Sequence, residues 1–166
     1  MQLTHYTTNF NKKKFPITLV CENVTNAPNI GSLFRIADAF GVEKIIFCGD
    51  NITLGRKMTK TSRATEKVVK HDVNCKVSDV VSALKALDYQ CIAIEITEDS
   101  EPIHTFRFSA KKPIALLIGD ENFGVSEHIL KACDHTIHIN MFGQNSSMNV
   151  VQATNIALYE ITKQIL

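Results

Sequence analysis

Short apolar segments alternate with longer amphipathic segments along nearly the whole of this 166-residue chain. The apolar segments are rich in Ile, Val and Phe, which are typical of β-strands. The segments at 44–49 and 113–119 are apolar without alternation, as expected for strands that are covered on both faces. These patterns predict strands at residues 17–24, 44–49, 67–73, 89–97, 113–119 and 135–140.

Helical periodicity is present between several of the predicted strands. In residues 30–40, the side chains of Ile30, Leu33 and Phe34 follow the spacing of one helix face, and Asn29 is placed to cap that helix. Strands that alternate with helices indicate an α/β fold with a mostly parallel sheet flanked by helices. Further helices are predicted at residues 77–87, 125–133 and 149–166.

The length of the chain suits one domain with its own core. We therefore expect a single domain over residues 1–166, with an N-terminal extension at 1–16. No apolar run approaches the length that crosses a bilayer, and the first residues lack the apolar core of a signal peptide, so we expect a cytoplasmic protein without a membrane partner. Five dispersed cysteines without a C-x-x-C pair predict reduced core thiols rather than a disulfide framework or a zinc site.

Positive charge is concentrated in one segment, although the formal net charge of the chain is only +1. Between residues 51 and 70, six cations stand against the single acid Glu66. Cations grouped in this way suit contacts with RNA phosphates, which supply affinity more than specificity. A solvated loop surface would have the same composition. The candidate RNA-binding residues are Arg56, Lys57, Lys60 and Arg63.

Three loops combine glycine with polar side chains directly after a predicted strand, at residues 23–35, 119–127 and 139–150. Ligands of parallel sheets bind beyond the carboxyl ends of the strands, so we expect a site at these loops. Gly119 and Gly124 have the spacing of a phosphate-binding loop, but the Lys-Ser/Thr pair of nucleotide triphosphate sites does not follow them. A G-x-G-x-x-G fingerprint is absent, and the histidines are not spaced to bind a metal.

Together, the three loops resemble the three signature motifs of the SpoU/TrmH family of RNA 2′-O-ribose methyltransferases, within the SPOUT superfamily. The order and spacing of the motifs carry this resemblance, which covers nearly the whole chain. Phe40 and Gly41 close the helix of the first motif, as they do in the family. The matching segments are Asn29 to Arg35, Ile118 to Gly124 and Ile139 to Val150.

The resemblance implies a C-terminal trefoil knot in which the second and third motif loops hold S-adenosylmethionine. Glycines would let the backbone approach the cofactor, amides of the third loop would bind its adenine and ribose, and apolar side chains would form the walls. The cofactor-binding residues that it implies are Ile118, Gly119, Glu121, Gly124, Ile139, Met141, Gly143, Ser147 and Met148.

The resemblance also implies a catalytic group. Arg35 would bind phosphate or activate the ribose hydroxyl, because an arginine holds its proton too tightly to be a good base; the identity of the base stays open. From composition alone, Arg35 would be a solvated side chain paired with Asp38, Glu121 a charge at a helix N-terminus, and Ser147 a helix cap. The catalytic residues that it implies are Asn29, Arg35, Glu121, Ser147 and Asn149.

Two positions depart from the third motif of the family. Asn140 replaces the usual proline, and the chain reads Ser-Met-Asn-Val-Val where Ser-Leu-Asn-Val-Ser is common; both changes are compatible with a cofactor pocket. The segment that resembles the family fills nearly the whole sequence, so we expect no amino-terminal RNA-binding domain of the kind that many ribosomal-RNA members carry. We therefore expect transfer RNA, rather than ribosomal RNA, as the substrate.

The final predicted helix carries apolar residues over a wider arc than one buried face needs, from Val150 to Ile165. The resemblance implies a homodimer, with Arg35 of one subunit close to the cofactor pocket of the other. Burial of this helix within the monomer would explain the same pattern. Two other functions stay open: a knotted RNA-binding protein without catalysis, and a SPOUT methyltransferase that acts on a base. No metal is implied.

Overall fold

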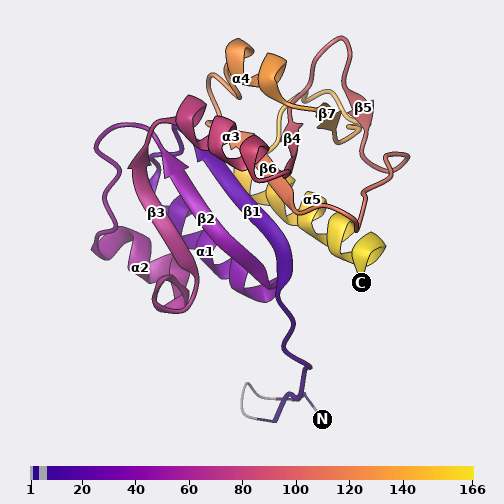
Figure 1. Ribbon diagram of the computed structural model, residues 1–166. Coiled ribbons are helices and arrows are strands. Elements are labelled where there is room, and N and C mark those ends of the chain that lie inside the picture. Colours follow the sequence, from indigo (N-terminus) through magenta and orange to yellow (C-terminus); the bar gives the residue numbers. More distant parts are fainter. Residues whose placement is uncertain (1, 4–6) are drawn as a thin grey trace.

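A seven-stranded sheet runs through the centre of the structure, in the order β3-β2-β1-β6-β4-β7-β5 (Figure 1). The computed structural model describes residues 2–3 and 7–166. Every pairing between these strands is parallel. The strands are β1 (Phe15–Glu22), β2 (Val42–Cys48), β3 (Lys70–Cys75), β4 (Gln90–Ile94), β5 (Glu101–Pro102), β6 (Ile114–Gly119) and β7 (His135–His138).

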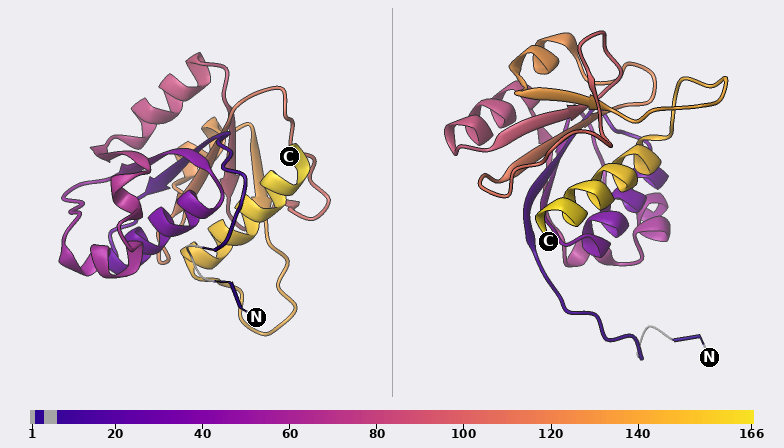
Figure 2. Two further views of the ribbon diagram at one scale, coloured as in Figure 1. Left: turned by 90° about the horizontal axis from the view of Figure 1, so that it is seen from below. Right: turned by 90° about the vertical axis from the view of Figure 1, so that its right-hand side faces the viewer.

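Helices cover both faces of this sheet (Figure 2). α1 and α5 contact each other on one face, whereas α3 and α4 contact each other on the opposite face. The central strand β6 is buried along its whole length, which explains why its sequence is apolar without alternation. The helices are α1 (Ala27–Ala39), α2 (Arg56–Ser62), the 3-10 helix η1 (Thr65–Lys67), α3 (Val77–Ala86), α4 (Glu127–Ala132) and α5 (Val150–Ile165).

The α/β fold class and all six predicted strands are confirmed, with shifted strand bounds. The hydropathy pattern does not predict α2, η1 or β5, which are short. The strand predicted from residue 67 begins only at Lys70, because Arg63 and Ala64 adopt left-handed conformations that turn the chain into η1. The sheet begins at Phe15, so the predicted extension ends before that residue; residues 1 and 4–6 lie outside the described part of the chain.

Helix α1 begins earlier than predicted, and the predicted cap at Asn29 is wrong. The helix starts at Ala27, and the side chain of Asn26 caps it by accepting the backbone N–H of Asn29 at 3.1 Å. Pro28 fits the first turn, because proline has no N–H to leave unsatisfied there. The side chain of Asn29 is therefore available for contacts outside the helix.

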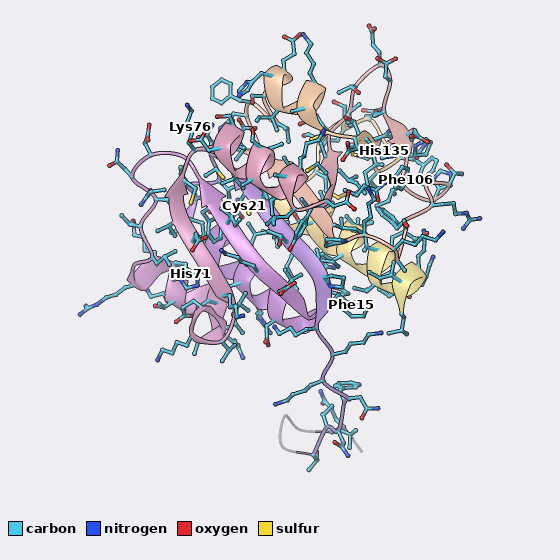
Figure 3. The ribbon with its side chains drawn as sticks, in the orientation of Figure 1. Phe15, Cys21, His71, Lys76, Phe106 and His135 are labelled. Atoms are coloured by element: carbon cyan, nitrogen blue, oxygen red, sulfur yellow. The ribbon has the colours of Figure 1, made fainter. Side chains whose placement is uncertain are left out.

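The cysteines are free thiols, as predicted. Cys21, Cys48 and Cys91 are buried, and Cys21 lies near the carboxyl end of β1, between β2 and β6 (Figure 3). Burial raises the pKa of Cys48 to about 12 and the pKa of Cys91 to about 11. These thiols stay protonated at neutral pH and act as small apolar side chains of the core.

Helix α2 packs closely against α1 at Gly31. A Cβ atom at this position would meet Thr61 Oγ1 at 2.0 Å and the carbonyl oxygen of Met58 at 2.2 Å. The hydroxyl of Thr61 lies 3.0 Å from the carbonyl oxygen of Pro28 and donates to it. The absence of a side chain at Gly31 therefore sets the distance between α1, which carries Arg35, and the basic residues of α2.

We predict that Gly31→Ala destabilises the fold. Alanine would gain about 1 kcal/mol of helix propensity, but its methyl group would displace the backbone of α2, and overpacking of this kind costs about 1–3 kcal/mol or more. Because the added methyl group meets backbone atoms, the upper end of this range applies, and urea denaturation should show a net loss of about 2 kcal/mol. The control is Gly143→Ala, since a Cβ there meets nothing within 4 Å. Equal stability of the two variants would contradict the close approach of α1 and α2.

Candidate functional site

A cavity of about 420 Å³ opens at the carboxyl ends of β4, β6 and β7. Its apolar walls include Ile118, Ile139 and Met148, and its polar groups come mostly from the loops that leave the strands. This size falls within the range of small-molecule sites. The lining side chains belong to the segments 94–97, 118–125, 138–141 and 146–153, with Leu130 from α4.

One carboxylate joins the three motif loops at this cavity. Glu121 Oε1 accepts a hydrogen bond from Asn29 Nδ2 and another from Asn149 Nδ2, each at 2.7 Å. Asn149 Nδ2 also lies 3.3 Å from Asn29 Oδ1, so the three side chains form a closed triangle. Asn29 stands in the first turn of α1, Asn149 caps α5, and Glu121 lines the cavity. The predicted catalytic residues Asn29, Glu121 and Asn149 are thus in direct contact.

Two glycines shape the second motif loop. A Cβ at Gly119 would meet the backbone of Gly124 at 2.0 Å. Gly124 has a φ of +65°, and a Cβ there would meet Glu95 Oε2 at 2.1 Å. A larger side chain at Gly119 or Gly124 would therefore displace the loop from the end of β4 and open the cavity wall.

Two further carboxylates, which follow or end the strands on either side of β6, accept hydrogen bonds from the end of the second motif loop. Glu95 Oε2 accepts the backbone N–H of Val125 at 3.1 Å. Glu22, which is only 5% exposed at the end of β1, accepts the backbone N–H of Ser126 at 2.9 Å and its hydroxyl at 2.6 Å. Within the described residues Glu22 has no cationic partner, so these neutral donors must stabilise its buried charge.

The third motif loop is mostly exposed and runs into α5. Asn149, and not Ser147, caps this helix, because the side chain of Asn149 accepts the backbone N–H of Val151 at 2.9 Å. Ser147 lines the cavity, and both its N–H and its hydroxyl donate to Asn145 Oδ1 at 3.2 Å. The cap interpretation of Ser147 is therefore wrong.

Most of the residues implied for cofactor binding are gathered around the cavity. Ile118, Gly119, Glu121, Gly124, Ile139, Met141, Ser147 and Met148 all line it, whereas Gly143 does not. Residues 94–97, at the carboxyl end of β4 and just beyond it, were not predicted as part of the site, although they contribute Glu95 to the cavity lining. A charged residue directly after an apolar strand, at the carboxyl edge of the sheet, is the signal that could have identified it.

Arg35 lies outside the cavity lining. It is exposed on α1, and neither it nor Asp38 takes part in an ion pair within the described part of the chain. The alternative in which these two side chains pair is therefore not found. The candidate RNA-binding residues Arg56, Lys57, Lys60 and Arg63 are exposed on α2 and at its end, and α2 packs against α1.

Residues 2–3 and 7–166 contain neither a metal-binding cluster nor a membrane-spanning helix. No group of three or more His, Cys, Asp or Glu side chains there could hold a metal ion. No helix in that part of the chain is long and apolar enough to cross a membrane.

Comparison with known proteins gives a consistent result. The sequence profile of the SpoU rRNA Methylase family matches residues 16–159. The chain is 28% identical to the 23S rRNA (guanosine-2′-O-)-methyltransferase RlmB of Ralstonia nicotianae, and 26% identical to the tRNA (guanosine(18)-2′-O)-methyltransferase of Escherichia coli strain K12. These alignments cover 90% and 89% of this chain but 59% and 63% of the relatives. The chain thus spans about three fifths of the length of the curated relatives it matches.

The fold is also similar to that of a solved structure with a bound ligand. This is the crystal structure of the SpoU methyltransferase AviRb from Streptomyces viridochromogenes in complex with the cofactor AdoMet. The TM-score is 0.79 and the sequence identity 26%, and the alignment covers 93% of this chain and 62% of that chain.

We predict that Ser126→Ala weakens the attachment of the second motif loop to β1. The variant removes the hydroxyl donor from the buried carboxylate of Glu22, which should lower the free energy of unfolding by about 1–3 kcal/mol. Thr105→Ala is the control, since its hydroxyl donates to the carbonyl oxygen of Pro102 at an exposed position. Chemical denaturation of both variants measures the difference, and an unchanged stability for Ser126→Ala would contradict the role of this contact.

Proposed function

The chain belongs to the SpoU rRNA methylase family, and on this basis we propose that it transfers a methyl group from S-adenosylmethionine to a ribose 2′-hydroxyl of RNA. The observation that carries this proposal is the triangle of Asn29, Glu121 and Asn149, which joins all three motif loops at one cavity. The similarity to 2′-O-methyltransferases of ribosomal and transfer RNA supports the same reaction.

The cavity suits the proposed cofactor. Its apolar walls can hold the flat adenine ring, and the close packing of Gly119 against Gly124 lets backbone groups reach a ligand without obstruction by side chains. S-adenosylmethionine, when bound, supplies an electrophilic methyl group. Ser147 lines the cavity beside Met148, and we assign its hydroxyl to the end of the site that faces the substrate.

The protein's contribution to methyl transfer is to position the two reactants. The triangle of Asn29, Glu121 and Asn149 fixes α1 and α5 relative to the cavity, which limits the geometries that the substrate can adopt. Arg35 is exposed on α1, on the face that points away from the core. It donates to a phosphate or to the ribose hydroxyl, and in the second case it stabilises negative charge on the ribose oxygen. No side chain is assigned as the base.

Structured RNA is the proposed substrate, and the basic residues of α2 are proposed to contact its phosphates. Arg56, Lys57, Lys60 and Arg63 are exposed, and none of them forms an ion pair among the described residues. They are therefore available to phosphate groups. We propose that the protein acts in the cytoplasm, on RNA of the kinds that the named relatives modify.

We also propose that the chain forms the trefoil knot and the homodimer expected for the SPOUT superfamily. The strand order β1-β6-β4-β7, in which β6 lies between β1 and β4, is compatible with such a knot. Ile156 and Tyr159 on α5 are 38% and 61% exposed and would be covered by a second subunit. A partner at this helix would bring Arg35 of one subunit toward the cavity of the other.

A direct test is transfer of labelled methyl from S-adenosylmethionine to transfer RNA and to ribosomal RNA. We expect transfer by the wild-type protein and a decrease of about 100-fold or more for Arg35→Ala, because loss of one well-placed donor typically costs this much. Cofactor affinity should not change in this variant, since Arg35 does not line the cavity. Arg107→Ala, at another exposed arginine, is the control. A full rate for Arg35→Ala would contradict the assigned role, and absence of transfer to any RNA, although the cofactor binds, would favour a binding protein without catalysis.

Sedimentation tests the proposed dimer. A dimer is expected at micromolar concentration, and Tyr159→Glu should shift the equilibrium toward monomer by placing a charge in the apolar contact. Ser82→Glu, exposed on α3 on the opposite face of the sheet, adds the same charge outside the proposed contact and is the control. A monomeric wild-type protein would refute the dimer.

A further inference from the structure

The cavity assigned to the cofactor is lined by three carboxylates, from Glu95, Asp120 and Glu121, and by no lysine or arginine. His138 is the remaining titratable side chain of the lining. An excess of negative charge in a small cavity favours the binding of a cationic ligand.

The three carboxylates are held by neutral donors and not by cations. Glu95 accepts two backbone N–H groups at 2.9 and 3.1 Å, Asp120 accepts two at 2.7 Å, and Glu121 accepts two side-chain amides at 2.7 Å. None of them belongs to an ion pair in the part of the chain that the structure describes. Their charges are therefore fixed in position and are not cancelled by a neighbouring side chain.

Other local charges do not remove this excess. The N-terminus of α5 reaches the cavity at Val150 and contributes a partial positive charge of about half an elementary charge. The buried carboxylate of Glu22 lies behind the second motif loop and adds to the negative side. Glu95 and Asp120 are half-buried, so solvent screens them less than it screens surface groups.

Methyl transfer changes the charge of the molecule in the cavity. The C–S bond breaks with its electron pair left on sulfur, the methyl group forms a bond to the ribose oxygen, and the hydroxyl proton is released to a base or to solvent. The sulfonium cation of S-adenosylmethionine thereby becomes the neutral thioether of S-adenosylhomocysteine.

We infer that the carboxylates of Glu95, Asp120 and Glu121 make this cavity selective for the sulfonium form of the cofactor, so that the protein binds the methyl donor more tightly than its own demethylated product. This inference depends on the proposed function, because it takes S-adenosylmethionine as the ligand. Its consequence is that the attraction decreases when the methyl group leaves, which favours exchange of the product for fresh donor.

Calorimetric titration of the full chain with three ligands tests the inference. At low salt, S-adenosylmethionine should bind about tenfold more tightly than S-adenosylhomocysteine. Sinefungin, which carries a protonated amine in place of the sulfonium methyl, should resemble the donor, because charge and not the methyl group is recognised. High salt should reduce the ratio of the two affinities, since mobile ions screen partly exposed carboxylates.

Asp120→Asn removes one charge with little change of shape. Only Oδ1 of Asp120 is engaged, by the backbone N–H groups of Asn122 and Phe123, and the amide oxygen of asparagine can accept both. The donor-to-product affinity ratio should fall by about threefold in this variant. Asp79→Asn, exposed on α3 and outside the cavity lining, changes the net charge equally and should leave the ratio unchanged.

The outcomes separate this inference from the proposed function. Equal affinity of donor and product in the wild-type protein, or a ratio that Asp120→Asn and salt do not alter, would overturn the inference while the cofactor site stands. If neither nucleoside binds, the cofactor site itself is wrong, and the inference fails with it. Should Asp120→Asn not fold, the salt series on the wild-type protein and the variant Glu95→Gln decide between the first two results.

Discussion

The arrangement of the site depends on the hydrogen bonds that the carboxylate of Glu121 accepts. Glu121 follows the central strand β6, and its two amide donors come from the first turn of α1 and the N-cap of α5. α1 and α5 lie on the same face of the sheet, so one side chain connects that helical layer to the loop that forms the cavity wall. A shorter or apolar side chain at this position would leave two polar amides without an acceptor and three loops without a common anchor.

Charge is distributed unevenly around this anchor. The cavity is lined by carboxylates, whereas the exposed side chains of α2, packed against α1, are cationic. A polyanionic RNA would be repelled by the cavity and attracted by α2, so the phosphate backbone would be held beside the cavity and a single ribose could approach its mouth. The close contact at Gly31 holds α2 against α1, and the first turn of α1 is bonded to Glu121 of the cavity lining through Asn29. Fold and electrostatics thus support the same division of roles between cofactor and substrate.

The sequence predicted the layered sheet because buried parallel strands leave a clear apolar pattern, and motif resemblance predicted that Asn29, Glu121 and Asn149 share a site. Periodicity could not have done the latter, since Asn29 and Glu121 are 92 residues apart. Helix α2 escaped prediction because it is polar and buries only two side chains. The contribution of 94–97 was missed because these residues continue a strand-like pattern without a turn signal. The N-cap of α1 was predicted at Asn29 instead of Asn26, because the apolar periodicity begins at Ile30 and hydropathy does not register Pro28 in the first turn.

The most direct test of the proposed reaction is to determine which atom of the RNA carries the methyl group. RNA incubated with the protein and labelled S-adenosylmethionine would be digested to nucleosides and analysed by mass spectrometry, with an untreated sample alongside. We expect a nucleoside that is methylated on its ribose. Ribose methylation also protects the adjacent phosphodiester from alkaline hydrolysis, because the 2′-oxygen can no longer attack it. A methyl group found on a base would contradict the proposed reaction and would identify the protein as a base methyltransferase.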